Sequence, residues 1–251
     1  SLVKSRRVPK SVIKIAKSIL EKIPSNERII KEWLPTDHEG TVSFISNYES
    51  IDFSKGKWLI QTRTNKMLEP IKDFFEDKGF YYSSKKGNNL ISKDLLIAID
   101  VWTSLSEGLL IPAKLARKAY SFMTVTGGKI KRGFGNGGSF KEVMEEVVCL
   151  DDLRKNHGLQ AAGSWDQAFD KIDERRKQYI LTLQRNGEDI LPTSKPRIRL
   201  STIHGAKGDE DENIVHFLDL DILSYNEFQR NPSPEHRLQF VGVTEQYLIC
   251  I

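Results

Sequence analysis

The feature that most constrains the fold is a strand–helix–strand pattern near the N-terminal end of the chain. Residues 57–61 have the apolar character of a buried strand, and residues 67–75 have apolar side chains at helical spacing. Gly79 is expected to end that helix, and residues 80–82 follow as a short strand. Strand, helix and strand at this spacing predict a parallel sheet covered by helices.

The pattern extends to both ends of the chain. A helix is predicted over residues 11–20 and a strand over 41–45. Near the other end, residues 197–200, 214–218 and 247–251 again have strand character. The simplest architecture is therefore one α/β domain built from both ends of the chain.

The middle of the chain has a different character, with hardly a strand between its helices. Helices are predicted over residues 94–105, 113–122, 140–148 and 174–184. We therefore expect residues 1–84 and 197–251 to form the α/β domain, and residues 85–196 to form a mostly helical insertion.

Composition limits the class of protein but not its activity. The 251 residues are 39% hydrophobic and 29% charged, which is enough apolar material for a core. No apolar run approaches the ~18–20 residues that span a bilayer, so we expect a cytoplasmic protein with no membrane partner. Cys149 and Cys250 match no metal spacing, and we expect both to be reduced core residues and no metal to be bound. The net charge of +4 is compatible with nucleic acid binding.

The chemically most informative stretch runs over residues 200–210, where a strand leads into a loop of small and polar residues. Gly205, Ala206 and Gly208 let the backbone approach a ligand closely, as phosphate-facing loops require. From the residues alone, an ordinary strand–loop turn is an equally good interpretation.

That loop carries a resemblance to a known family. Its Thr-Ile-His-Gly-Ala-Lys-Gly sequence, followed by an acidic cluster, is similar to motif V of the UvrD/Rep-type superfamily 1 DNA helicases. In the family this loop lies between single-stranded DNA and the nucleotide. The resemblance implies that Glu210 contacts the ATP ribose and that Gly208 borders ATP. It also implies DNA contacts by Thr202, His204 and Lys207.

A second stretch, residues 5–12, resembles motif IV, whose arginine reaches the γ-phosphate of ATP. That position is Arg7, for which the resemblance implies a catalytic role. A guanidinium suits it because it binds phosphate oxygens bidentately. Taken without the resemblance, the arginine pair here is better interpreted as solvated surface charge.

A third stretch, residues 58–65, looks like the strand ending in Arg-Thr-Asn that touches DNA in these motors. The resemblance makes Arg63 and Asn65 DNA-binding residues. Parallel sheets place ligands at the carboxyl ends of their strands, as this position requires. Asn65 is alternatively a helix N-cap, and both roles are compatible.

The last match, residues 235–244, resembles motif VI and implies that Arg237 lies at the ATP site. Here the sequence departs from the family, which continues Thr-Arg-Ala-Lys after the position of Thr244. Either Glu245 replaces that arginine, or three residues are absent and Glu245 aligns beyond them. Loss of an arginine finger costs ~10³–10⁵ in rate, which places full catalytic competence in question.

The sequence contains no Gly-x-x-x-x-Gly-Lys-Ser/Thr motif, which supplies the primary ATP and Mg²⁺ site in this family. The resemblance therefore implies a C-terminal half, with a RecA-like 2A domain and a 2B-like insertion. ATP with Mg²⁺, single-stranded DNA and N-terminal ATP-binding domains of the same protein are the expected ligands and partners. The expected activity is 3′→5′ translocation in DNA repair or replication, with this half alone inactive. The alternative is a non-catalytic DNA-binding or interaction module derived from a helicase.

Two other features receive structural interpretations. Residues 133–138 formally match Gly-x-Gly-x-x-Gly, but no strand leads into them, so we expect no dinucleotide site. A surface loop is the favoured interpretation and contact with a DNA backbone the alternative. Trp102 and Trp165 fall at helical positions and are expected in the core.

Overall fold

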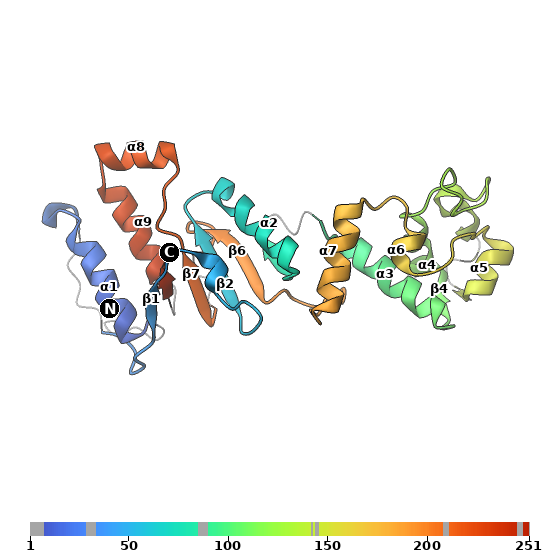
Figure 1. Cartoon of the computed structure of the whole chain (residues 1–251), viewed down its shortest axis with the longest axis horizontal. Coiled ribbons are helices and arrows are strands. Elements are labelled where there is room, and N and C mark those ends of the chain that lie inside the picture. Colours follow the sequence, from blue (N-terminus) through green and yellow to red (C-terminus); the bar gives the residue numbers. More distant parts are fainter. Residues whose placement is uncertain are drawn as a thin grey trace. The chain divides into compact units, whose positions relative to one another are not determined.

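A computed structural model describes residues 8–28, 34–84, 90–141, 143, 146–207, 211–244 and 248–250. The chain forms two compact units (Figure 1). Unit 1 comprises Ser1–Lys86 and Pro196–Ile251, and unit 2 comprises Gly87–Lys195. Unit 1 is thus assembled from two separate stretches of sequence.

Unit 1 contains a six-stranded sheet in the order β1-β8-β7-β2-β6-β3. Its strands are β1 (Val42–Phe44), β2 (Trp58–Thr62), β3 (Tyr82–Ser84), β6 (Ile198–Thr202), β7 (Asn213–His216) and β8 (Leu248–Cys250). Every pairing of neighbours in this sheet is parallel. The α/β class and the parallel sheet predicted from the sequence are confirmed.

Unit 1 also contains helices. They are α1 (Lys10–Glu21), α2 (Glu69–Lys78), α8 (Ile222–Arg230) and α9 (Ser233–Val243), with short 3₁₀ turns η1 (Ser25–Glu27), η2 (Tyr48–Ser50) and η3 (Asn65–Leu68). α1 and α9 lie side by side (Figure 1). Gly79 ends α2 as predicted, with a φ of 71° that favours glycine.

The strand β2 is buried on both faces, so its sequence is a continuous buried run rather than an alternation. On one face, Leu59 joins a core with Ile214 of β7 and residues of α1 and α9. On the other face, Trp58 packs edge-on against Phe53, which packs in turn against Phe75 of α2. Successive side chains of a strand point to opposite faces, so β2 ties the two layers of helices together.

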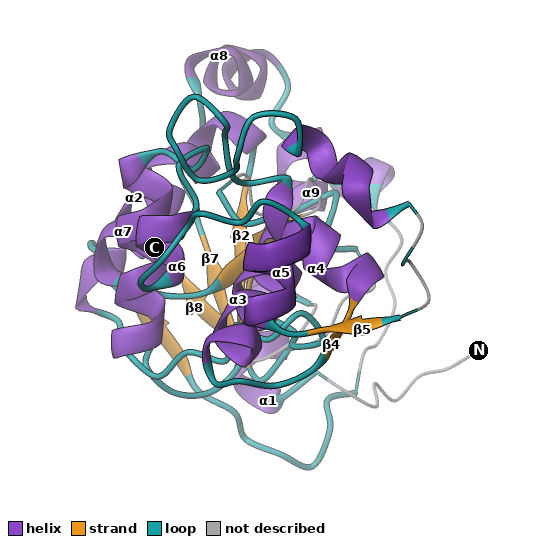
Figure 2. Ribbon diagram, turned by 90° about the vertical axis from the view of Figure 1, so that its right-hand side faces the viewer, coloured by secondary structure: helices purple, strands orange, loops and turns teal. Residues whose placement is uncertain are grey.

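Unit 2 is mostly helical, as expected. Its elements are α3 (Lys93–Ser106), β4 (Ile111–Pro112), α4 (Ala113–Tyr120), η4 (Gly135–Phe140), β5 (Val147–Val148), α5 (Leu150–Asn156), α6 (Trp165–Ala168) and α7 (Glu174–Arg185). Figure 2 shows β4 and β5 side by side, and they pair antiparallel. Trp102 and Trp165 are buried, as predicted.

Two predictions for unit 2 are wrong. The helix predicted over 140–148 does not form in its described part, because Phe140 ends η4 and Val147–Val148 form β5. Two adjacent β-branched residues favour an extended backbone, and β4 offers them a partner strand. Cys149 is a free thiol, but it is only half-buried, with its Sγ 3.0 Å from Asp152 Oδ2 rather than in the core.

Among the helices of the described residues, none combines the length and the apolar character that crossing a bilayer requires.

The packing of Phe53 between Trp58 and Phe75 predicts how much this ring stabilises unit 1. Phe53→Ala removes a fully buried ring that contacts Trp58 and Phe75. We expect the free energy of unfolding to fall by roughly 3–5 kcal/mol, the usual loss when a buried aromatic side chain is truncated. Urea unfolding measures it. Phe44→Ala is the matched control, because Phe44 is 67% exposed; equal losses in the two variants would contradict the packing described.

Candidate nucleic-acid interface

The register of β2 and β6 brings two of the predicted DNA-binding stretches to one edge of the sheet. The last residues of the two strands, Thr62 and Thr202, are register partners in a parallel pair. The backbone N–H of Ile203 donates to the carbonyl oxygen of Thr62 at 3.0 Å. Arg63 and His204 therefore leave the sheet at its carboxyl edge, from neighbouring strands.

The other predicted DNA-binding residues lie at the same edge. Asn65 is exposed and begins η3; its interpretation as an N-cap is wrong, because Thr64 occupies the N-cap position. Thr202 ends β6, and its hydroxyl accepts a hydrogen bond from the Gly205 N–H at 3.1 Å. His204 and Lys207 are exposed in the loop that follows. The edge therefore presents several polar side chains to solvent.

Three residues with predicted roles at the ATP site, Arg7, Gly208 and Glu210, lie outside the described residues. Their described neighbours nevertheless share one core. Val8 and Ala206 are buried in the cluster that also contains Val243 of α9. The segments that resemble motifs IV, V and VI are thus packed against one another.

Arg63 is held by an ion pair. Its Nε lies 2.8 Å from Oε2 of Glu235, in the first turn of α9. The Glu235 side chain is 8% exposed and that of Arg63 is 22% exposed. A carboxylate this buried requires a charged or hydrogen-bonding partner, so the arginine and the helix position each other.

The Glu235 carboxylate continues into a chain of buried polar side chains. Its Oε1 accepts a hydrogen bond from Gln239 Nε2 at 2.8 Å. Gln239 Oε1 contacts Nε2 of His216, and Nδ1 of His216 lies 3.2 Å from Oε1 of Gln61. Gln61 and His216 are themselves register partners on β2 and β7. We name these five side chains, Arg63 included, the buried polar chain.

The sequence reasoning missed the buried polar chain, although a signal was present. Gln61 and His216 each stand two residues after an apolar core residue, Leu59 and Ile214, and so on the same inward face of a strand. A polar residue at such a position indicates a buried hydrogen-bonding partner. Burial lowers the pKa of His216, while the hydrogen bond with Gln239 and the charge of Glu235 act in the opposite direction.

Arg237, predicted at the ATP site, contacts Glu27. Its Nη2 donates to the backbone oxygen of Glu27 at 3.0 Å and lies 3.1 Å from that residue's carboxylate. Both side chains are about half exposed, 47% and 42%. This contact ties α9 to the turn after α1, and the ATP role of Arg237 stays a prediction.

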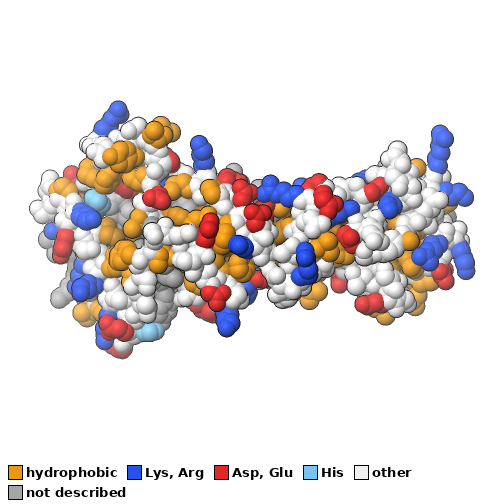
Figure 3. All heavy atoms as spheres, in the orientation of Figure 1, with side chains coloured by type: hydrophobic (Ala, Val, Ile, Leu, Met, Phe, Trp, Pro, Cys, Tyr) orange, Lys and Arg blue, Asp and Glu red, His pale blue; other side chains and the backbone are white. Residues whose placement is uncertain are grey.

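A cavity of about 300 Å³ lies beside Arg63. Its walls include Phe228 and Arg230 of α8 and Asn231. An aromatic ring beside guanidinium groups can stack a base and hold a phosphate. The outward face of α8 exposes Ile222 and Leu223, and Figure 3 shows hydrophobic side chains gathered there.

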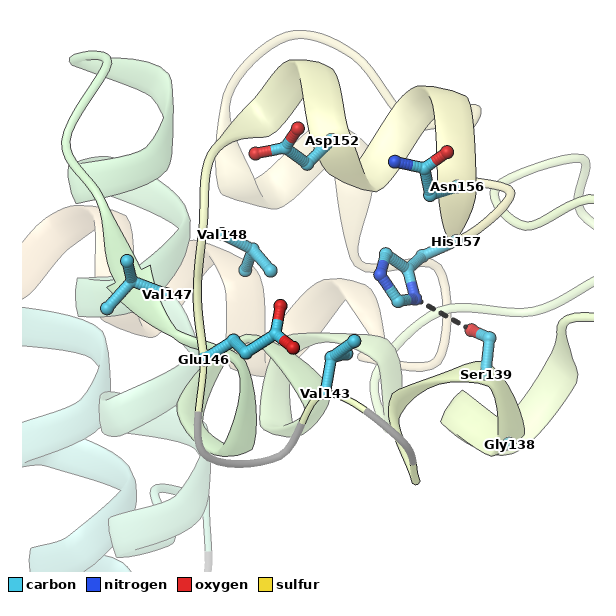
Figure 4. Close-up of a pocket in the computed structure, with 9 residues that line it drawn as sticks. All are labelled: Gly138, Ser139, Val143, Glu146, Val147, Val148, Asp152, Asn156 and His157. Atoms are coloured by element: carbon cyan, nitrogen blue, oxygen red, sulfur yellow. Dashed lines mark hydrogen bonds between the residues drawn. The ribbon is translucent and has the colours of Figure 1, made fainter.

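Unit 2 has a cavity of its own, of about 580 Å³ (Figure 4). His157 Nδ1 lies 3.0 Å from Ser139 Oγ in it, and the His157 ring stacks on Phe140. The carboxylate of Asp152 accepts a hydrogen bond from the backbone N–H of Cys149 at 3.1 Å, and not one from His157. Within the described residues no carboxylate hydrogen-bonds to His157, so a nucleophile–base–acid triad is not assembled here.

Comparisons with known proteins add no assignment. No protein-family model matches the sequence, and no curated protein matches it. In the part of the chain that the structure describes, no three His, Cys, Asp or Glu side chains are grouped to hold a metal ion.

The burial of His216 predicts a pH dependence of stability. In the unfolded chain a histidine has a pKa of roughly 6.5, whereas burial lowers the pKa of His216 in the folded state. As the pH falls toward the pKa of the unfolded histidine, the unfolded state binds more protons than the folded state. The free energy of unfolding therefore falls as the pH drops. Urea unfolding between pH 7.5 and 5.5 should show a smaller fall for His216→Gln. His157 and His236 also have lowered pKa values, so part of the fall is common to the unmodified chain and to His216→Gln. The contribution of His216 is the difference between the two. The same fall in both proteins would contradict the role given to His216.

Gly242 of α9 gives a second prediction. A Cβ at this position lies 2.3 Å from Cε1 and 2.9 Å from Nδ1 of His216. Gly242→Ala must therefore displace the imidazole or the helix, and overpacking of this kind costs roughly 1–3 kcal/mol. Gly138→Ala is the control, since a Cβ there meets no described atom within 4 Å. Thermal unfolding compares the two, and an unchanged melting temperature for Gly242→Ala would refute the close contact.

Proposed function

We propose that this chain is the C-terminal half of an ATP-dependent DNA helicase that moves 3′→5′ along single-stranded DNA. Unit 1 is then the RecA-like 2A domain of a UvrD/Rep-type motor, and unit 2 its 2B-like insertion. The observation that carries the proposal is the meeting of Arg63, Asn65 and the 202–207 loop at one carboxyl edge. In sequence, these residues resemble motifs that contact DNA. The parallel register of β2 and β6 supports one shared site for them.

The DNA-facing chemistry rests on side chains that bind phosphodiesters. Arg63 and Lys207 are cations, and Arg63 binds phosphate oxygens in a fork. Asn65, Thr202 and His204 supply polar contacts to phosphate, sugar or base. The cavity with Phe228 lies next to Arg63 and offers a stacking surface.

The ATP-facing role is assigned to Arg7, Gly208, Glu210 and Arg237. Arg7 stabilises charge on the γ-phosphate, and Glu210 accepts a hydrogen bond from a ribose hydroxyl. ATP with Mg²⁺ is bound primarily by N-terminal domains of the same protein, because this sequence has no phosphate-binding loop motif. The chain alone is accordingly inactive as an ATPase.

The mechanism couples the two sides through the 202–210 loop. ATP turnover opens and closes the cleft between the 2A domain and the N-terminal domains. Arg63 and the loop keep hold of the strand while the domains move, which advances the motor along the DNA. The shared core of Val8, Ala206 and Val243 would make the three motif segments move as one body.

The test is ATP hydrolysis stimulated by single-stranded DNA. We expect activity in the longest natural product of the gene and none in this chain. Arg7→Ala in the long product should lower the rate by about 10³-fold or more, as expected for a γ-phosphate arginine. Arg185→Ala, an exposed arginine in α7, is the control; equal rates in both variants would contradict the assignment of Arg7.

A second candidate is a non-catalytic DNA-binding or interaction module that kept the fold. One observation favours it: Thr244 is followed directly by Glu245-Gln246-Tyr247, where the family carries the arginine finger of its Thr-Arg-Ala-Lys sequence. DNA binding without ATP hydrolysis in the long product would establish this alternative.

DNA binding by the chain itself gives a further prediction. Each phosphate contact to a single strand contributes about 0.7 to the slope of log affinity against log salt. We therefore expect Arg63→Ala to reduce that slope by about 0.7, measured with a fluorescent oligonucleotide. Arg154→Ala in α5 serves as the charge-matched control. An affinity independent of salt would overturn the phosphate-binding role.

A further inference from the structure

The buried polar chain has a direction that follows from hydrogen-bond chemistry. An ionised carboxylate only accepts hydrogen bonds, so Gln239 must turn its amide nitrogen toward Glu235, as the 2.8 Å contact has it. The amide oxygen of Gln239 then faces His216. Because that oxygen is an acceptor, Nε2 of His216 must carry a proton.

The other side of the imidazole completes the assignment. A neutral imidazole that donates from Nε2 can only accept at Nδ1, and burial favours the neutral form. Gln61 Oε1 lies at Nδ1, while Gln61 Nε2 is buried without a partner among the described residues. Half a turn of this terminal amide, whose two ends have nearly the same shape, directs Nε2 to Nδ1 and gives both groups a partner.

We propose that Gln61, His216 and Gln239 form a one-directional hydrogen-bond relay that fixes Glu235, and through it positions Arg63 as an anion-binding group. Gln61 donates to His216, His216 to Gln239, and Gln239 to Glu235. Glu235 also accepts from Arg63 Nε at 2.8 Å. Such chains are cooperative, because each bond polarises the next.

The relay leaves Arg63 suited to a phosphate. Glu235 occupies Nε, and no described residue hydrogen-bonds to Nη1 or Nη2 of Arg63. The side chain is 22% exposed and borders the cavity with Phe228. Two free N–H groups in one plane match two oxygens of a phosphodiester. That the bound phosphate belongs to single-stranded DNA rests on the proposed function. The relay itself rests on the hydrogen bonds alone.

The first test is the protonation of His216 in the unmodified chain. Long-range ¹H–¹⁵N spectra distinguish the two ring nitrogens, and His216→Gln identifies the signals among the five histidines. At pH 7.5 we expect a proton on Nε2 and none on Nδ1. A proton on Nδ1, or on both nitrogens, would overturn the relay.

The second test is the positioning of Arg63, read without DNA. The Arg63 Nε–H should exchange slowly with water, and Gln239→Met should accelerate it about threefold to tenfold, as for residues coupled in one network. Gln229→Met is the control, since Gln229 is exposed on α8. Unchanged exchange in folded Gln239→Met would sink the positioning role. Should that variant not fold, Glu235→Gln makes the same comparison, with the same expected acceleration.

The third test connects the relay with DNA. Gln239→Met should weaken single-stranded DNA binding about threefold to tenfold, and adding it to Arg63→Ala should cause no further loss. Independent, additive losses would show that Gln239 does not act through Arg63. If the unmodified chain binds no DNA while the first two tests succeed, the proposed function fails and the relay stands.

Discussion

The parallel pairing of β2 with β6 on one side and β7 on the other is the constraint on which unit 1 depends. All five residues of β2 are buried, so the strand fixes both layers of helices as well as its neighbours in the sheet. Parallel strands end at the same edge. The register of Thr62 with Thr202 therefore brings together the loops after β2 and β6, which are far apart in sequence.

The central strands β2 and β7 also carry buried polar side chains, and α9 supplies their hydrogen-bonding partner. Gln61 and His216 point inward where apolar residues would otherwise pack, and a buried polar group without a partner costs about 1–3 kcal/mol. Gln239 supplies the hydrogen bonds and Gly242 the space for the imidazole. Glu235, one turn earlier on the same helix, reaches Arg63. Core packing and the exposed edge are thus linked by one helix.

The sequence predicted the parts of the fold that depend on local patterns. A continuous apolar run predicted β2, apolar residues at helical spacing predicted α1, and Gly79 predicted the end of α2, because these signals depend on neighbouring residues only. Periodicity could not distinguish a helix from β5, whose partner strand lies about 35 residues away. The buried polar chain was missed for a related reason: it exists only once the register of β2 and β7 is known. Motif resemblance found the edge residues, but not the partner that holds Arg63.

Amide hydrogen exchange of this chain, with and without a single-stranded oligonucleotide, tests the central claim most directly. It reports protection along the whole backbone and requires neither ATP nor other domains. If the carboxyl edge binds DNA, we expect slower exchange in residues 63–68 and 202–207, and no change in α5 of unit 2. Protection confined to unit 2, or no protection at a saturating oligonucleotide concentration, would contradict the DNA-binding edge.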